Sequence, residues 1–317
     1  MPVLPTRITS KPQYVLHPMR AVRRAMSKPA SGNAIRVAPL PWGVDLQVRE
    51  SDAIGYSILV GGVFDPSVTE TVYRLIDPGD LVVDVGANVG YITSLAAVQA
   101  GPTGRVTSFE PHPQVFDILR SNVDVWQGNP GMARIDPQRL ALSDRAGTGQ
   151  IVAGPEFDHN MGLATLAQHS SHDANEHSHD VVLQRLDEVI REPIGLLKID
   201  VEGHEAEVLS GAGTLLERQL VRDIVFEDHD LYPSRATEIV EQAGYRLVSL
   251  TNDLRGLRLE RPRDRGAAPA WPGPSYLATA DPSRSIARLT SRGWCVQGIG
   301  ISAPLLGALR RRVGPRA

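Results

Sequence analysis

The chain has 317 residues, of which 42% are hydrophobic and 22% are charged, and its formal net charge is −3. This composition is typical of an ordinary globular protein that is long enough for one large α/β domain with appendages. Cys295 is the single cysteine, which excludes a disulfide framework within the chain and a cysteine-based zinc site. One unpaired cysteine fits a reducing compartment, and we expect a cytoplasmic location.

The N-terminal part is basic. No acidic residue precedes Asp45, and the segment has no apolar run long enough for a signal peptide or a membrane span. We expect residues 1–32 to form a disordered basic tail, with weak contact to an anionic surface as the alternative. The basic residues of this region are Arg7, Lys11, Arg20, Arg23, Arg24, Lys28 and Arg36.

Residues 33–78 are predicted to form a small β/α extension in front of the main domain. Val44, Leu46 and Val48 alternate with polar residues, which is the period of a half-buried strand. Residues 52–63 and 66–76 are expected to be helical, and the Asp-Pro-Gly-Asp turn at 77–80 leads into the first strand of the sheet.

Strands and helices alternate from residue 79 to 281, which predicts a mainly parallel sheet with helices on both faces. Residues 275–280 are expected to close the sheet as an antiparallel strand, and residues 282–317 to form a basic C-terminal extension. The other predicted strands are 81–85, 105–109, 134–142, 195–201, 221–227 and 244–250, and the predicted helices are 90–100, 113–126, 203–217 and 234–243.

Residues 147–180 interrupt this pattern with a long polar segment that contains five of the nine histidines. A metal site is one interpretation, because imidazole and carboxylate are common ligands. The irregular spacing matches no metal motif and favours a solvated loop, so no metal site is predicted. The histidines are His159, His169, His172, His177 and His179.

The most informative stretch is 81–90, where an apolar run ends in Asp84 and a turn carries Gly86, Asn88 and Gly90 before an apolar helix. The order strand, glycine turn, helix is typical of a nucleotide site in an open α/β sheet. A dinucleotide loop reads G-x-G-x-x-G, whereas here an acid precedes the first glycine by two residues. That arrangement suits a cationic ligand without phosphate, and S-adenosylmethionine is such a ligand.

Glu110 supports this site. It ends the next predicted strand and lies 20 residues after Gly90, which is where an acid accepts hydrogen bonds from a ribose diol. The alternative interpretation is that Glu110 only begins the following helix, where acids complement the helix dipole.

A second cluster of titratable residues follows the buried strand near 195–201. Asp200 lies at the strand end, and Glu227 ends the next strand, so their carboxylates are expected to meet at one crevice. Two carboxylates there raise one pKa, and the raised group could act as a general base. The candidate catalytic residues are Asp200, then Glu227, followed by Glu202, His204 and His229. The alternative is that the glutamates cap helices or pair with a basic residue.

Five motifs come in the order of the FkbM family of S-adenosylmethionine-dependent methyltransferases, which the chain resembles over about residues 60 to 280. They are Asp84-Val85-Gly86-Ala87-Asn88-Val89-Gly90-Tyr91, Phe109-Glu110-Pro111, Ala141-Leu142-Ser143-Asp144, Lys198-Ile199-Asp200-Val201-Glu202-Gly203-His204-Glu205 and Phe226-Glu227.

The resemblance implies a class I methyltransferase (Rossmann-like) sandwich with a mostly parallel seven-stranded sheet. It also implies methyl transfer from S-adenosylmethionine to a hydroxyl of a sugar, glycan or secondary metabolite. The acceptor is thus a small molecule or glycan, and no nucleic acid partner is expected. The residues implied for the cofactor are Asp84, Gly86, Asn88, Gly90 and Glu110, with Ser143 and Asp144 near the adenine.

Three alternatives stay open at this point. The first is an NAD(P)-dependent sugar oxidoreductase, although the loop lacks the third glycine of such enzymes. The second is a non-catalytic cofactor-binding module with the same fold. The third is a variant of the methyltransferase in which a divalent metal bridges Asp200 and Glu227 to a substrate diol. The oligomeric state cannot be read from the sequence.

Overall fold

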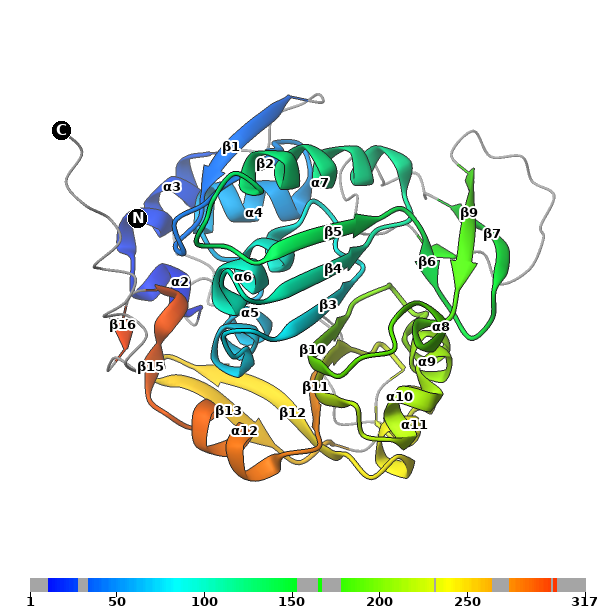
Figure 1. The fold of residues 1–317 in the computed structure, drawn as a ribbon. Helices are drawn as coiled ribbons and strands as arrows, with labels where there is room; N and C mark the ends of the chain where they lie inside the picture. Colours follow the sequence, from blue (N-terminus) through cyan, green and yellow to red (C-terminus); the bar gives the residue numbers. More distant parts are fainter. Residues whose placement is uncertain are drawn as a thin grey trace.

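A computed structural model describes residues 11–27, 34–152, 165–166, 178–230, 232–263, 274–297 and 299–300. Its centre is an eight-stranded sheet with the order β13-β12-β14-β11-β10-β3-β4-β5 (Figure 1). These strands are β3 (Leu81–Val85), β4 (Arg105–Phe109), β5 (Arg134–Gln138), β10 (Ile194–Ile199), β11 (Val221–Glu227), β12 (Arg246–Asp253), β13 (Gly256–Glu260) and β14 (Ser275–Thr279).

The predicted sheet is confirmed in its centre and differs at its edges. β5, β4, β3, β10 and β11 are parallel neighbours, and β14 is antiparallel to both β11 and β12. β14 therefore lies inside the sheet instead of closing it. The eighth strand, β13, is added by a hairpin on the edge strand β12. The predicted strand 134–142 is two strands, because Pro137 and Gln138 end β5 and the chain then enters a second sheet.

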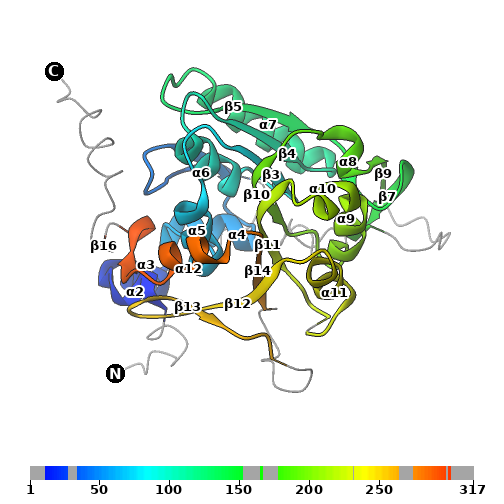
Figure 2. The same cartoon turned by 60° about the horizontal axis from the view of Figure 1, so that its bottom comes forward.

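The central strands are apolar because helices cover both faces of the sheet. Every residue of β3 and of β10 is buried, as expected for parallel strands between two helical layers. Successive residues of one strand face opposite cores: Val82 packs in the core with the α5–α7 helices, and Val83 in the core with α9–α11. Figure 2 shows the two helical layers on either side of the sheet.

The helices of the first layer are α4 (Ala53–Gly61), α5 (Pro66–Leu75), α6 (Tyr91–Ala100) and α7 (Pro113–Trp126). Those of the second layer are α8 (Leu186–Val189), α9 (Glu205–Gly211), α10 (Gly213–Glu217) and α11 (Arg235–Gln242). The predicted helix 203–217 is thus divided into α9 and α10. Asp52 caps α4 by accepting a 2.8 Å hydrogen bond from the Gly55 N–H, as its position before an apolar run favours.

The N-terminal extension contains the hairpin β1 (Ile35–Pro39) and β2 (Asp45–Arg49), together with α4 and α5. Part of the segment expected to be a disordered tail is helical, as α2 (Pro12–Val15) and α3 (Pro18–Met26). α3 packs against α4, and this tertiary contact is what the polar composition alone did not reveal. α12 (Pro282–Leu289) packs against α5 and begins the C-terminal extension.

The segment expected to be a solvated loop carries strands at its ends. β6 (Ala141–Leu142), β9 (Ser178–Gln184), β7 (Gly147–Val152) and β8 (Thr165–Leu166) form a separate four-stranded sheet. His179 lies on β9, whereas His159, His169, His172 and His177 lie outside the described residues. In the described part of the chain, no helix is long and apolar enough to cross a membrane.

Candidate functional site

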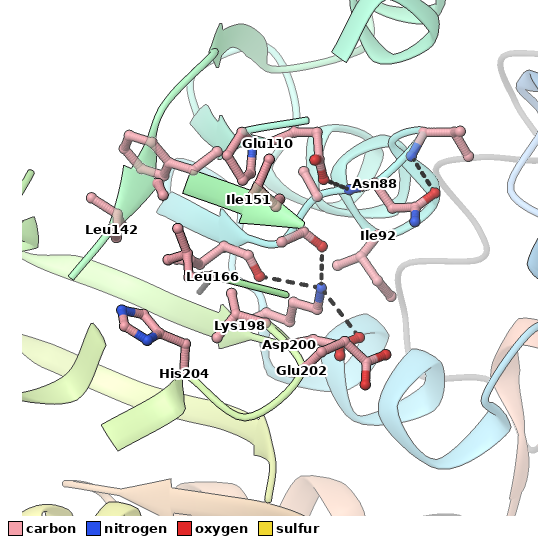
Figure 3. Close-up of a pocket in the computed structure, with 18 of the residues that line it drawn as sticks. Asn88, Ile92, Glu110, Leu142, Ile151, Leu166, Lys198, Asp200, Glu202 and His204 are labelled. Atoms are coloured by element: carbon pink, nitrogen blue, oxygen red, sulfur yellow. Dashed lines mark hydrogen bonds and ion pairs between the residues drawn. The ribbon is translucent and has the colours of Figure 1, made fainter. Parts of the chain in front are cut away.

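A pocket opens at the carboxyl ends of β3, β4 and β10, which is where an open α/β sheet binds ligands (Figure 3). The empty space within it, including the part open to solvent, is about 960 Å³. Polar groups come from Asn88, Glu110, Lys198, Asp200, Glu202 and His204, and apolar walls from Ile54, Phe64, Ile92, Leu142, Ile151 and Leu166.

The two glycines of the first motif are required by the fold itself. Gly86 has φ = 71°, and a Cβ atom there would lie 1.8 Å from the carbonyl oxygen of Asp200. Gly90 has φ = 95°, and its Cβ would meet the Leu119 side chain at 2.8 Å. Glycine at 86 therefore lets the loop after β3 touch the end of β10, which joins the two sequence motifs in space.

Glu110 is fixed at the tip of β4 by backbone amides. Its Oε2 accepts a 2.9 Å hydrogen bond from the Asn88 N–H, and its Oε1 accepts one of 2.9 Å from the His112 N–H. Burial raises the pKa of this carboxyl to about 7, although both hydrogen bonds favour the charged form. Glu110 lines the pocket, so the structure brings it next to Asn88 and the glycine loop as the sequence predicted.

Lys198 is the polar centre of the pocket floor, and our candidate list omitted it. Its Nζ donates a 2.8 Å hydrogen bond to the Gly86 carbonyl and lies 3.6 Å from Asp200 Oδ2 (Figure 3). The same nitrogen lies 3.4 Å from Asp84 Oδ1. Burial works against the charged form, but the attraction of Asp84 and Asp200 outweighs it and raises the pKa of the ammonium group. A cation thus links the cofactor motif to the acid at the end of β10.

Asp84 lies under the floor rather than in the pocket wall. Its side chain is fully buried, with one carboxylate oxygen near Lys198 and the other accepting a 2.6 Å hydrogen bond from the Thr93 hydroxyl. The sequence predicted that Asp84 binds the cofactor. The structure places its side chain outside the pocket lining, 3.4 Å from the ammonium group of Lys198, which does line the pocket.

Acidic groups crowd the other end of the pocket. Burial raises the pKa of Glu202 to about 7, with Asp200 and Glu205 adding repulsion. Burial likewise raises the pKa of Glu227 to about 8, with Asp200 and Asp65 the next causes. The side chain of Asp200 itself is 40% exposed.

His229 joins two of these acids, because its Nε2 lies 3.6 Å from both Glu202 Oε2 and Glu227 Oε1. The predicted catalytic residues Asp200, Glu202, Glu227 and His229 therefore form one group at neighbouring strand ends. Sequence reasoning missed Asp65, which repels Glu227 from the start of α5. No motif marks Asp65, since its only local signal is that of a helix cap.

His204 lies apart from this group, on the side of the pocket formed by the small sheet. Its Nε2 is 3.0 Å from the Ser143 hydroxyl, which also donates to Asp144 at 3.2 Å. Burial lowers the pKa of the imidazole, so the neutral form is favoured. The structure thus groups His204 with Ser143 and Asp144, the residues predicted near the adenine, rather than with the acids.

The polar residues that line the pocket fit a cationic cofactor. In the described ranges, no three His, Cys, Asp or Glu side chains are arranged to hold a metal. The ribose, amine and sulfonium of S-adenosylmethionine would find Glu110, the Asn88 loop and the acids around Lys198, and the apolar walls would enclose the adenine. Chemically, such a site can position a methyl donor beside carboxylates that accept protons.

A mostly parallel sheet with helices on both faces and a pocket at the carboxyl ends of its strands defines an open α/β protein with a small-molecule site. Residues 84–247 match the profile of the methyltransferase FkbM domain, and the chain belongs to that family. The match begins at Asp84 and contains every predicted site residue, including both motifs that meet at Gly86.

Three curated relatives resemble the chain over part of its length. Methyltransferase sdnD of Sordaria araneosa is 31% identical over 46% of this chain and 65% of its own. The 31-O-demethyl-FK506 methyltransferase FkbM of Streptomyces tacrolimicus is 33% identical over 49% of this chain and 67% of its own. The hexuronic acid methyltransferase AglP of Haloferax volcanii is 30% identical over 52% of this chain and 62% of its own. The chain therefore spans about two thirds of the length of these relatives.

Proposed function

We propose that this protein transfers the methyl group of S-adenosylmethionine to a hydroxyl group of a sugar, glycan or small secondary metabolite. The observation that carries the proposal is the polarity of one pocket. One end has a single acid, Glu110, held by two amides. The other end has Asp200 and Glu202, and His229 joins Glu202 to Glu227. Burial raises the pKa of Glu202 to about 7 and that of Glu227 to about 8.

The cofactor is assigned to the side of Glu110. A carboxylate held at the tip of β4 can accept hydrogen bonds from two adjacent ribose hydroxyls. The loop from Gly86 to Gly90 then lies beside the methionine part. Asp84 and Asp200 together outnumber the single charge of Lys198, which supports a net attraction for the sulfonium.

The acceptor hydroxyl is assigned to the acid group at the ends of β10 and β11. In the transfer, the acceptor oxygen forms a bond to the methyl carbon while the carbon–sulfur bond breaks, leaving S-adenosylhomocysteine and a methyl ether. A carboxylate takes the hydroxyl proton, with Asp200 first and Glu227 second as base. Holding oxygen, carbon and sulfur in line supplies much of the rate. Glu227, whose pKa burial raises to about 8, is suited to proton transfer near neutral pH.

The names of two relatives support an oxygen acceptor. One relative is named for an O-demethyl compound, and another for a hexuronic acid. These names describe those proteins, and we extend to this chain only the chemistry they share, a hydroxyl-bearing acceptor.

Calorimetric titration with S-adenosylhomocysteine and with NAD⁺ tests the cofactor. We expect micromolar binding of the former alone, and the reverse result would favour the oxidoreductase. Incubation with methyl-labelled S-adenosylmethionine and an extract of glycans and metabolites, followed by mass spectrometry, then tests the reaction. Full labelling by the Asp200→Asn, Glu227→Gln double variant would contradict the assigned bases, and binding without any labelling would favour a non-catalytic module.

A further inference from the structure

Two arginines in the described chain are buried to the same extent, since Arg49 and Arg74 are each 8% exposed. Arg74 is satisfied by Glu70 at 2.6 Å and by the carbonyls of Ser291 at 2.7 Å and Gly293 at 2.8 Å. Arg49 differs, because its Nε and Nη1 have no hydrogen-bond partner among the described residues. Two buried guanidinium nitrogens without an acceptor are costly, which points to a ligand that supplies one.

The position of Arg49 is fixed by close packing. It ends β2, its carbonyl accepts a hydrogen bond from the Asp52 N–H at 3.3 Å, and a Cβ on Gly55 would lie 2.3 Å from that carbonyl oxygen. The first turn of α4 therefore packs against the backbone of Arg49 and fixes the position of its Cα atom.

The Arg49 guanidinium belongs to a group of three nitrogen-bearing side chains. The rings of His112 and His179 meet edge to face, with centroids 4.9 Å apart. Burial, then His179, then Arg49 lower the pKa of His112 to about 4, so the positive charge of the guanidinium acts on this imidazole. His112 also precedes α7, whose positive N-terminal end adds to the potential.

This group adjoins the pocket. His112 follows Glu110 and Pro111, which line the pocket wall, and His179 pairs in register with the lining residue Ile151. Glu110 is an acid that lies two residues before His112 in the same loop. Its two carboxylate oxygens accept hydrogen bonds from the amides of Asn88 and His112. An anionic group beside Arg49 could therefore belong to a molecule that occupies the pocket.

We propose that Arg49, His112, His179 and the start of α7 form an anion-binding subsite at the edge of the pocket, which takes a carboxylate or phosphate group carried by the acceptor. The existence of the subsite does not depend on the proposed function. The claim that the anionic group belongs to the methyl acceptor does depend on it. The acceptor is accordingly an acidic molecule, such as a uronic acid or a phosphorylated sugar.

Binding of inorganic phosphate, measured by phosphorus NMR at constant ionic strength with saturating S-adenosylhomocysteine, tests the subsite. Arg49→Gln is expected to weaken phosphate binding about 10- to 100-fold, the size of a lost charge-assisted hydrogen bond. The matched control is Arg36→Gln, because Arg36 is exposed on the neighbouring strand and pairs with Glu50. Phosphate should raise the melting temperature of the wild type and of Arg36→Gln, and not that of Arg49→Gln.

A second variant keeps the proposal testable if Arg49→Gln does not fold. His179→Asn changes a partly exposed residue on β9 and should weaken phosphate binding by a smaller factor. Glucuronate and glucose 6-phosphate should displace phosphate from the wild type, whereas glucose should not.

Three results would overturn the proposal. Equal phosphate binding by the wild type and Arg49→Gln would mean an adventitious ion only. A loss of S-adenosylhomocysteine affinity in Arg49→Gln would place the cofactor's own carboxylate there. If neither glucuronate nor glucose 6-phosphate displaced phosphate, the bound anion would not be a group carried by the acceptor. If phosphate binding depends on Arg49 while S-adenosylhomocysteine does not bind, the proposed function fails and the anion site itself stands.

Discussion

The two ends of the pocket hold their carboxylates in different ways. At the β4 end, both oxygens of Glu110 accept hydrogen bonds from backbone amides, one in the loop after β3 and one in the loop after β4. At the β10 and β11 ends, the acids are placed by other side chains, with Lys198 near Asp200 and His229 between Glu202 and Glu227. An acid held by the backbone is suited to recognising a fixed ligand, and acids that repel one another are suited to exchanging protons.

The comparison teaches which substitutions each end should tolerate. Backbone amides remain when a side chain is changed, so damage at the β4 end stays local and appears as lost cofactor affinity. At the other end the charges depend on one another, so removal of one changes the pKa of the rest. Lys198 belongs to both ends, because its ammonium group contacts the Gly86 carbonyl as well as Asp200.

Lys198→Met should have the largest effect, because it leaves two acids without the cation between them. Loss of one partner from a buried ion pair costs about 3–5 kcal/mol of the free energy of unfolding. Urea denaturation at pH 7 measures this loss, and Lys198→Arg serves as the control that keeps the charge. A change in stability below about 1 kcal/mol would contradict the central role of this ammonium group.

Glu110→Ala should affect the cofactor end alone. It removes the proposed ribose acceptor and leaves the amides of Asn88 and His112 without their partner, so we expect about 100-fold weaker binding of S-adenosylhomocysteine. Calorimetry measures the affinity, and Glu110→Gln, which keeps one carbonyl oxygen, should lose less. An affinity of Glu110→Ala for S-adenosylhomocysteine within twofold of the wild type would contradict the assignment of the cofactor to the β4 end.

Glu227→Gln should change the pH dependence at the acid-rich end. The pKa of Glu227 is raised to about 8 by burial and by Asp200 and Asp65. Because this value lies above that of the unfolded chain, the folded state binds the proton more tightly, and stability falls as the pH rises from about 4.5 to 8. The variant should show a smaller fall in melting temperature between pH 5 and 8.

The same substitution makes a prediction about activity. If Glu227 must be ionised, the rate for the wild type rises as the pH approaches 8, and this rise is reduced in Glu227→Gln. Identical pH profiles for both proteins would assign the proton to another group, and Asp200→Asn is then the variant to compare.

Ser143→Ala should have the smallest effect. It removes the 3.0 Å contact with His204 Nε2, which is worth about 0.5–1.5 kcal/mol. We expect a small fall in cofactor affinity by calorimetry and little change in the pH profile of the reaction. A changed pH profile would connect His204 with the acids and contradict the separation seen in the structure.

The sequence by itself determined the parts of this protein that local chemistry controls. The apolar runs predicted β3, β4, β10 and β11, and the apolar residues of 52–63 and 66–76 predicted α4 and α5. The spacing of Glu110 after the glycine turn predicted that these residues lie together. Each of these inferences depends on residues close in the chain, or on the rule that parallel strands end at one edge of a sheet.

Only the tertiary structure decided which long-range neighbours these residues have. It placed β14 inside the sheet, put Asp84 beneath the floor with Lys198, and moved His204 to the side of Ser143. It also buried two Arg49 nitrogens without a hydrogen-bond partner among the described residues. The physical reason is that burial and charge pairing depend on distances between segments far apart in the chain, and spacing along the sequence carries no record of those distances.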